Sequence, residues 1–221
     1  MNICILIPIL NEAKAIGGIV KELREKKFSV VVIDDGSKDN SGELATQNGA
    51  VVLTNEINRG KGFSLQKGFQ YVLDHGYDGV ITMDGDGQHA IDDLEHFIQS
   101  PNLKTNTIIN GNRLANSQKM PFVRLQTNRL MSFLISSVCR QKIPDTQCGY
   151  RFIGKDVLKT IKLTSDCYEI ESEILIKSAK KGFSIHSVPV ETIYRGETSY
   201  IRPVRDTLRF FKYLLKEIFS S

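Results

Sequence analysis

Short apolar runs alternate with polar turns and segments of helical periodicity through the first half of the chain. The runs are rich in β-branched residues and apolar throughout, which is typical of strands covered on both faces. We expect strands at 3–7, 30–33, 51–53, 80–83 and 107–109, and helices at 13–26, 42–48, 62–75 and 91–99. In the third helix, Leu65, Phe69 and Val72 repeat at i, i+4 and i+7. This order predicts an α/β domain with a mostly parallel central sheet flanked by helices.

The regular alternation stops after about residue 110. The pattern then predicts a polar loop at 111–119, a helix at 122–138 and a loop that ends in DTQCGYRF at 145–152. A helix at 170–181, a strand at 184–190 and a terminal helix from Pro203 complete the chain. Its 221 residues contain no internal repeat, low-complexity tract or linker, so we expect one domain spanning 1–221.

Composition narrows the class of protein. The chain has 29 Lys and Arg against 25 Asp and Glu, a net charge of +4, and no basic stripe interleaved with stacking aromatics, so nucleic-acid binding is not expected. The 4 cysteines form no CxxC pair, which favours reduced thiols in a cytoplasmic protein. The longest apolar run, 3–10, is far shorter than the ~20 residues that cross a bilayer. We expect a soluble protein, at most attached to the inner face of a membrane.

Four polar clusters follow predicted strands. They are PILNE at 8–12, DDGS at 34–37, NRGKG at 58–62 and DGDGQH at 84–89. Ligands of open α/β sheets bind outside the carboxyl ends of the strands, where such loops converge. The four clusters are therefore expected to line one edge of the sheet.

The DGDGQH cluster has the donor chemistry of a divalent-cation site. Asp84, Asp86 and Gln88 offer hard oxygen ligands, which suit Mg²⁺ or Mn²⁺ bound through one or two carboxylates and substrate phosphates. The alternative is an acidic turn that caps the following helix. The shared sheet edge favours the metal-diphosphate interpretation.

DDGS and NRGKG are less specific than DGDGQH. DDGS is an ordinary turn, although a carboxylate at a strand end can also accept hydrogen bonds from a base or ribose. In NRGKG, Arg59 and Lys61 can neutralise phosphate or form a solvated basic turn. The chain contains neither GxGxxG nor GxxxxGK[ST], which argues against hydride-transfer cofactors and P-loop chemistry.

The ordered set IPILNE, VVIDDGS, NRGKG and MDGDGQH resembles the family 2 glycosyltransferases of the GT-A fold, a Rossmann-like architecture, and within them the dolichyl- and polyprenyl-phosphate sugar synthases. The resemblance continues through GNR at 111–113, DTQCGYRF, YEIESE at 168–173 and VPVETIYRGETSYI at 188–201. It implies inverting transfer of a sugar from a UDP- or GDP-sugar, with residues 1–110 as the donor half and 111–221 as the acceptor half.

The resemblance also implies roles for individual residues. Those that contact the nucleotide would be Pro8, Asn11, Glu12, Asp35, Lys61 and Asp84. Asp86 and Gln88, with Asp84, would hold a Mg²⁺ or Mn²⁺ ion in this DxD motif, and the ion would stabilise the departing diphosphate.

Chemistry and acceptor recognition are assigned to the second half. Asp145 would orient the acceptor, or act as general base if the acceptor is a hydroxyl. An anionic lipid phosphate needs no base, and Arg113, Arg124 and Arg151 would then clamp phosphate. Each arginine alone is equally well explained as a surface ion pair.

The chain departs from the family pattern in three places. Leu10 replaces a frequent aromatic, RGETSY at 195–200 replaces a later RxxGxSK motif, and no C-terminal transmembrane helices follow. The second change leaves open whether Arg195 or Arg202 serves the diphosphate. The terminal helix from Pro203 combines an apolar stripe with a basic one, which fits either packing on the domain or contact with an anionic membrane or membrane partner.

Two other functions remain as alternatives. One is a non-catalytic nucleotide-sugar-binding module that recruits a membrane partner, and the other is a sugar-1-phosphate nucleotidyltransferase, for which no glycine-rich loop follows the first strand. His89, His96, Asp92 and Asp93 are expected on a solvated polar face rather than in a second metal cluster. Glu171 and Glu173 fit either an acceptor site or an acidic first helical turn.

Overall fold

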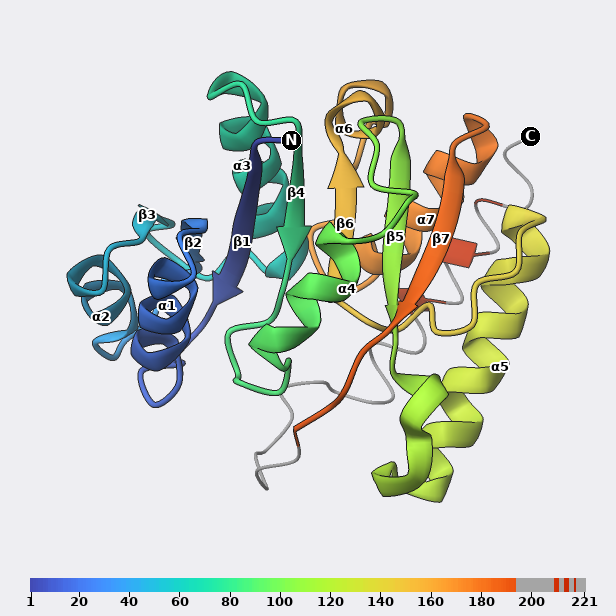
Figure 1. Ribbon diagram of the computed structural model, residues 1–221, viewed down its shortest axis with the longest axis horizontal. Coiled ribbons are helices and arrows are strands. Elements are labelled where there is room, and N and C mark those ends of the chain that lie inside the picture. Colours follow the sequence, from blue (N-terminus) through green and yellow to red (C-terminus); the bar gives the residue numbers. More distant parts are fainter. Residues whose placement is uncertain (194–208, 211–212, 215–216, 218–221) are drawn as a thin grey trace.

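A seven-stranded sheet runs through the whole protein (Figure 1). The computed structural model describes residues 1–193, 209, 210, 213, 214 and 217, without the side chains of 117–119. The strands are β1 (Ile3–Ile9), β2 (Ser29–Asp34), β3 (Val51–Thr54), β4 (Gly79–Thr82), β5 (Thr107–Asn112), β6 (Arg151–Gly154) and β7 (Ser184–Pro189). Their order is β3-β2-β1-β4-β6-β5-β7, so segments from both halves of the chain pair within one sheet.

Helices cover both faces of this sheet, as the doubly buried strands predict. The described helices are α1 (Ile16–Glu25), α2 (Ser41–Gln47), α3 (Lys61–Asp74), α4 (Leu94–Ile98), α5 (Phe122–Cys139), α6 (Lys155–Thr160) and α7 (Ile170–Lys180), with 3₁₀ segments η1 (Ile91–Asp93) and η2 (Arg113–Lys119). One core packs α3, α5, α6 and α7 against the sheet, and the other packs α1, α2 and α4.

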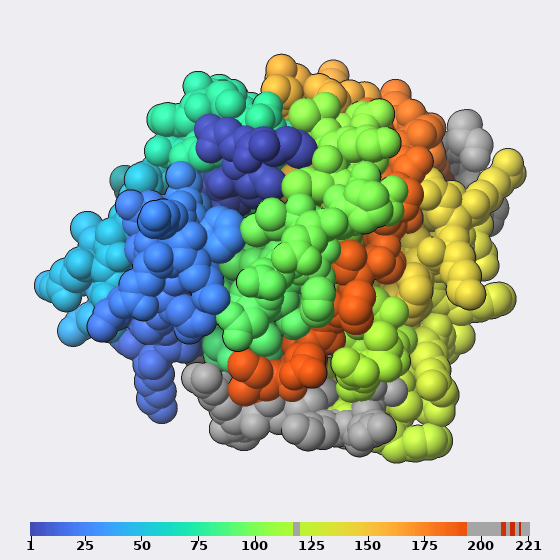
Figure 2. Space-filling model, viewed as in Figure 1, coloured from blue at the N-terminus to red at the C-terminus, as the bar shows by residue number. Residues whose placement is uncertain are grey.

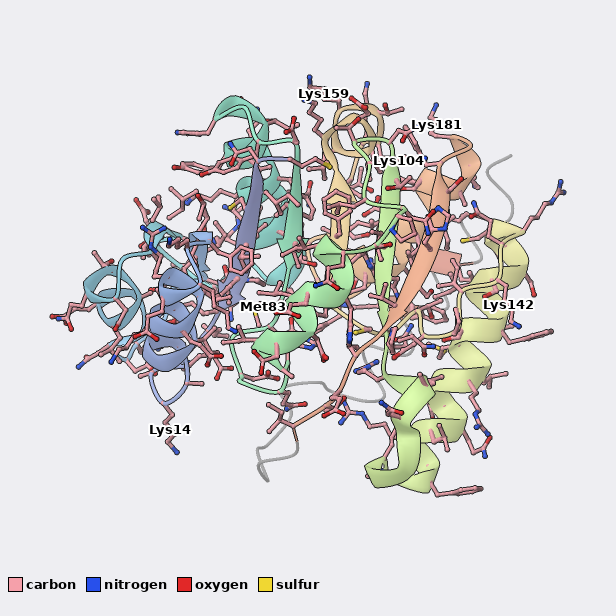
Figure 3. All side chains as sticks on the ribbon, in the orientation of Figure 1. Lys14, Met83, Lys104, Lys142, Lys159 and Lys181 are labelled. Atoms are coloured by element: carbon pink, nitrogen blue, oxygen red, sulfur yellow. The ribbon has the colours of Figure 1, made fainter. Side chains whose placement is uncertain are left out.

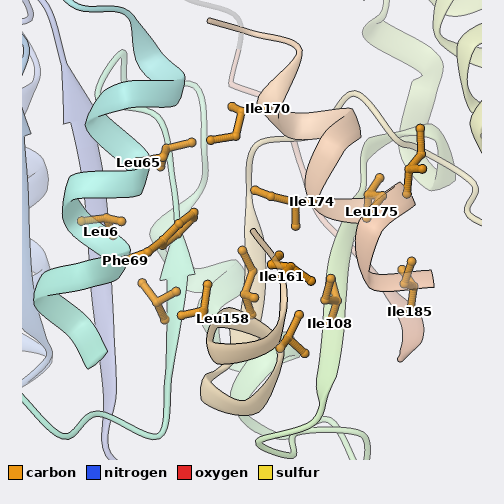
Figure 4. Packing of buried hydrophobic residues seen from close by; sticks show 14 of the residues in the cluster. Leu6, Leu65, Phe69, Ile108, Leu158, Ile161, Ile170, Ile174, Leu175 and Ile185 are labelled. Carbon is orange, nitrogen blue, oxygen red and sulfur yellow. The ribbon is translucent and has the colours of Figure 1, made fainter. Parts of the chain in front are cut away.

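In the first core, the apolar residues that repeat along α3 pack against β1. In Figure 4, Leu65 and Phe69 of α3 lie close to Leu6 of β1, and Ile174 of α7 lies on the same side of the sheet. Leu6, Leu65 and Ile174 are at most 1% exposed. Burying a side chain of this size contributes about 1.5–3 kcal/mol, so the i, i+4 pattern of α3 fixes its position on β1.

The second half contains a strand and a helix that the sequence pattern did not predict. Residues 151–154 form β6, which runs antiparallel to β4 and β5 and whose first two residues were expected to end a loop. Arg151 pairs with Thr82 of β4 and with Asn110 of β5 in register, so the antiparallel direction brings the start of β6 to the carboxyl ends of its neighbours. Helix α6 follows directly. The expectation of a mostly parallel sheet is confirmed, because every strand pair that excludes β6 is parallel.

The end of the chain is described only in part. The described residues between 209 and 217 are helical, in agreement with the predicted terminal helix, and Phe210, Tyr213 and Leu214 join the first core. The predicted start at Pro203 and the predicted apolar stripe lie outside the described residues. Within the described part of the chain, no helix has the length and apolar character needed to span a membrane.

Candidate functional site

Asp35, at the carboxyl end of β2, organises the loop that leads into α3. Its carboxylate is 4% exposed and accepts hydrogen bonds from the backbone amides of Arg59 and Gly60, at 2.9 and 2.8 Å, and from Asn55 Nδ2 at 2.8 Å. Gly60 has φ +97°, a conformation that favours glycine. The predicted convergence of the DDGS and NRGKG clusters is therefore present, and Asp35 fixes the loop through buried hydrogen bonds.

The amino end of α3 is closed by backbone from the second half of the chain. The amides of Gly62 and Phe63 donate to the Asp166 carbonyl at 2.8 and 3.1 Å. A side chain at Gly62 would place its Cβ 2.2 Å from the Ser165 carbonyl oxygen, so only glycine permits this approach. These two amides are therefore engaged within the protein, while the Lys61 side chain extends to the carboxylate of Asp84.

Lys61 joins carboxylates from the two halves of the chain. Its Nζ lies 2.6 Å from Asp84 Oδ1, at the end of β4, and 2.8 Å from Glu171 Oε1, in the first turn of α7. Burial acts to raise the pKa of Asp84, but the Lys61 ammonium and a hydrogen bond from His89 outweigh it and hold that pKa far below its usual range. Asp84 is therefore a carboxylate at any physiological pH.

Asp86 has a different environment from Asp84. Its Oδ1 accepts a hydrogen bond from the Gln88 amide at 2.9 Å, and Oδ2 accepts none from the described residues. Burial, with the neighbouring negative charge of Asp84, raises the pKa of Asp86. A cation beside this carboxylate would relieve both effects. Asp84 follows Met83, which Figure 3 labels beside α4.

His89 belongs to this site and was not recognised from the sequence. It is 7% exposed, its Nε2 lies 3.4 Å from Asp84 Oδ2, and its ring lies 4.8 Å from that of Tyr150. The expectation that His89 and Asp93 lie on a solvated face was wrong. Asp93 is 6% exposed and accepts a hydrogen bond from the Glu191 amide at 2.6 Å, whereas Asp92 is exposed and pairs with Lys26. His89 and Asp84 belong to the same DGDGQH segment, and this closeness in sequence was the signal that could have placed His89 in the site.

Asp145 and Arg113 form a buried bidentate pair. Arg113 Nε lies 2.8 Å from Asp145 Oδ2 and Nη2 lies 3.0 Å from Oδ1, while the amides of Arg113 and Gln147 donate to the same carboxylate. Asp145 is fully buried and Arg113 is 9% exposed. Such a carboxylate is held rigidly, and its oxygens already accept hydrogen bonds.

Arg151 is also fully buried, and each nitrogen of its guanidinium donates to a protein acceptor. Its Nε donates to Asn110 Oδ1 at 2.6 Å, Nη2 to the Cys148 carbonyl at 3.1 Å and Nη1 to the Glu171 carbonyl at 2.9 Å. Nη1 also lies 3.3 Å from Glu171 Oε2. Glu171 is thus shared between Lys61 and Arg151, and its side chain is 14% exposed. Of the two alternatives for YEIESE, the exposed acidic turn is therefore wrong for Glu171, and a role in an acceptor site stays a prediction.

A pocket of about 540 Å³ opens at the ends of β1 and β2. It is lined by Leu10, Asn11, Gly36, Lys38, Glu56, Ile57 and Asn58. Asn11, at φ +57°, donates its backbone amide to Ser37 Oγ at 2.9 Å and accepts a hydrogen bond on Oδ1 from the Lys38 amide at 2.8 Å. Pro8 lies within β1, and the Glu12 amide donates to Ser41 Oγ at 2.7 Å, so PILNE and DDGS form one wall.

Three further arginines were predicted to bind phosphate, and one of them is among the described residues. Arg124 is exposed in the first turn of α5, and Arg195 and Arg202 lie outside the described residues. No group of three His, Cys, Asp or Glu side chains that could hold a metal ion occurs in the described part of the chain.

The chain is similar to known glycosyltransferases. Residues 4–162 match the model of glycosyl transferase family 2. The chain is 30% identical over 215 residues to the UDP-N-acetylglucosamine–dolichyl-phosphate N-acetylglucosaminyltransferase of Methanococcus voltae, which covers 87% of this chain and 86% of the relative. It is 28% identical over 210 residues to the undecaprenyl-phosphate mannosyltransferase of Micrococcus luteus, with 88% and 85% covered.

A solved structure shares the fold. Glucosyl-3-phosphoglycerate synthase from Mycobacterium tuberculosis, in complex with Mn²⁺, UDP and glucosyl-3-phosphoglycerate, has a TM-score of 0.71 at 17% identity, covering 99% of this chain and 79% of that one. The family match spans most of the chain, including Asp35, Lys61, Asp84 and Asp145. The chain therefore belongs to glycosyl transferase family 2 and has the GT-A fold.

Proposed function

We propose that this chain is a metal-dependent, inverting glycosyltransferase that moves a sugar from a UDP- or GDP-sugar to a polyprenyl phosphate or a similar lipid-linked acceptor. The observation that carries the proposal is the pair of unequal carboxylates at the end of β4. Lys61 and His89 hold Asp84 deprotonated, while Asp86, two residues on, keeps one oxygen without a described partner. Because β1, β2 and β4 are parallel, both carboxylates follow the same sheet edge as the 540 Å³ pocket.

The residues present fit a Mg²⁺ or Mn²⁺ ion. Asp86 and Gln88 supply hard oxygen donors, with Asp84 beside them, and such ions are commonly bound by one or two carboxylates plus substrate phosphates. A site with only these few protein donors agrees with such binding, because substrate phosphates would supply the other ligands. The ion, when bound, would supply electrostatic stabilisation of the leaving diphosphate.

The chain's own residues would position the donor. The pocket beside Asn11 and Gly36 suits the nucleoside, and Lys61 places an ammonium against the β4 carboxylate Asp84. Lys61 would stabilise diphosphate charge as the bond to the anomeric carbon breaks. A single attack by the acceptor oxygen, on the side opposite the departing diphosphate, would invert the configuration of the anomeric carbon.

The acceptor assignment draws on the relatives, whose names specify dolichyl phosphate and undecaprenyl phosphate. A phosphate oxygen is already anionic and needs no general base. This agrees with a positioning role for Asp145, which Arg113 engages through both oxygens. The exposed Arg124 is a candidate for acceptor phosphate, as are Arg195 and Arg202. A cytoplasmic protein at the inner membrane face would meet such an acceptor.

Nucleotide-linked stabilisation tests the donor site. Thermal unfolding is followed with UDP, GDP and their sugars, with and without Mn²⁺, for the wild type, Asp86→Asn and the control Asp92→Asn. We expect stabilisation that needs both metal and diphosphate and that Asp86→Asn alone abolishes. Transfer of labelled sugar into organic-extractable polyprenyl phosphate then separates an enzyme from a non-catalytic nucleotide-sugar-binding module, which would bind without turnover. No stabilisation with any nucleotide would refute the donor-site assignment.

A further inference from the structure

Helix α5 presents a concentrated apolar face to solvent. Phe122, Val123, Leu130 and Phe133 are 72%, 76%, 56% and 68% exposed, and they account for four of the nine large hydrophobic side chains that are exposed among the described residues. Single exposed apolar residues are ordinary in folded proteins, but a group of them on one helix marks an interaction surface.

Helical periodicity places these side chains together. Phe122 and Phe133 are three turns apart on one side of α5, and Val123 and Leu130 flank the same side. The buried residues of α5, including Asn128, Ser132 and Ile135, lie on the opposite side and face the protein. The exposed apolar face is therefore additional to the one that packs α5 on the core.

The segment of the chain that contains this face carries charge of one sign. No Asp or Glu occurs between Glu95 and Asp145, whereas Lys and Arg occur seven times in that interval. Arg124, Arg129, Arg140 and Lys142 are exposed on α5 and the turn after it, and none forms a salt bridge with a described residue. Figure 3 shows Lys142 beside α5. Unpaired basic side chains around apolar ones are complementary to an anionic surface.

The face also lies where a membrane-bound substrate would be met. α5 follows η2, which begins directly after β5, so its first turns lie at the carboxyl edge of the sheet, on the side of the candidate site (Figure 1). Figure 2 shows α5 along one edge of the molecule, with α2 and β3 at the opposite edge. A second copy of the chain is disfavoured as the occupant, because a two-fold contact would bring like charges together.

We propose that the exposed face of α5 docks the protein on an anionic lipid bilayer, with Phe122, Leu130 and Phe133 in the headgroup region and Arg129 and Lys142 on anionic lipids. This surface is distinct from the candidate site. Its function requires neither donor, metal nor acceptor, so it stands or falls separately from the proposed glycosyl transfer.

Flotation of the full chain with phosphatidylcholine vesicles, with and without phosphatidylglycerol and with chelator present, tests the proposal. We expect binding only to the anionic vesicles, weakened about tenfold or more in Phe122→Ser/Phe133→Ser and in Arg129→Glu/Lys142→Glu. The control Val51→Ser, an exposed apolar residue on β3, should bind as the wild type does. Thermal unfolding confirms that each variant is folded. The proposal would be overturned if the Phe122→Ser/Phe133→Ser variant bound anionic vesicles as well as the wild type does, or if the wild type did not bind them. A dimer that depends on Phe133 would also overturn it.

Discussion

The ammonium of Lys61 lies 2.6 Å from Asp84, so the amino end of α3 and the carboxyl end of β4 are joined by an ion pair at the centre of the candidate site. Burial acts to lower the pKa of Lys61, but Asp84 and Glu171 raise it. Both partners are therefore charged across the physiological range. The same ammonium reaches α7 through Glu171, which couples the two halves of the chain.

Replacing Lys61 by Met should destabilise the protein. Asp84 and Glu171 would both lose the ammonium that they share, leaving Glu171 with Arg151 and Asp84 with His89. Because Asp84 is about one third exposed, we expect the lower range of such effects, about 1–3 kcal/mol of unfolding free energy. Urea denaturation measures it. Lys67→Met, on the same helix, removes an ammonium bonded only to neutral oxygens and serves as the control. Equal losses in the two variants would show that the ion pairs contribute nothing specific.

The Asp145–Arg113 pair should behave as one structural unit. Removing either partner leaves a buried charge, so Asp145→Ala and Arg113→Ala should each cost about 3–5 kcal/mol. The double variant should lose less than the sum, with a coupling of about 0.5–3 kcal/mol in a double-mutant cycle measured by urea denaturation.

The pH profile of transfer separates positioning by Asp145 from general-base catalysis. Asp145→Asn keeps the shape and loses the charge. For a positioning residue we expect reduced stability and an unchanged acid limb of kcat. Unchanged stability with loss of that acid limb would identify Asp145 as a general base instead.

Glu173 should make stability depend on pH. Burial acts to raise its pKa, but Lys177 and hydrogen bonds from Ser165 and Thr164 outweigh it, so the pKa is lowered on folding. A lowered carboxyl pKa contributes stability above the unfolded-state value, near 4.3, and the contribution is lost as pH falls through the folded value. Glu173→Gln should therefore be about 2–4 kcal/mol less stable near neutral pH.

The difference between Glu173→Gln and the wild type should shrink as the pH falls below about 4. Urea midpoints across this range check it. Glu43→Gln, exposed on α2, should stay within about 0.5 kcal/mol of the wild type throughout. A deficit in Glu173→Gln that persists unchanged into acid would mean that packing, rather than charge, is responsible.

The sequence predicted the first five strands and the edge where their polar loops meet, because doubly buried strands and helical periodicity are local signals. It did not predict β6. That strand has four residues, begins with an arginine, and is stabilised by the distant partners Asn110 and Glu171, which no local pattern reveals. For the same reason the pairing of Arg113 with Asp145, 32 residues apart, was not predicted, and neither was the place of Glu171 beside Lys61.

Transfer of labelled sugar from a nucleotide donor to polyprenyl phosphate, with Mn²⁺ and in detergent so that membrane docking has no influence, tests the central claim most directly. The wild type and Asp92→Asn should form an organic-soluble product, whereas Asp86→Asn should lose about 100-fold or more in kcat and chelator should abolish activity. Full activity of Asp86→Asn, or no transfer by the wild type from any UDP- or GDP-sugar, would contradict the account.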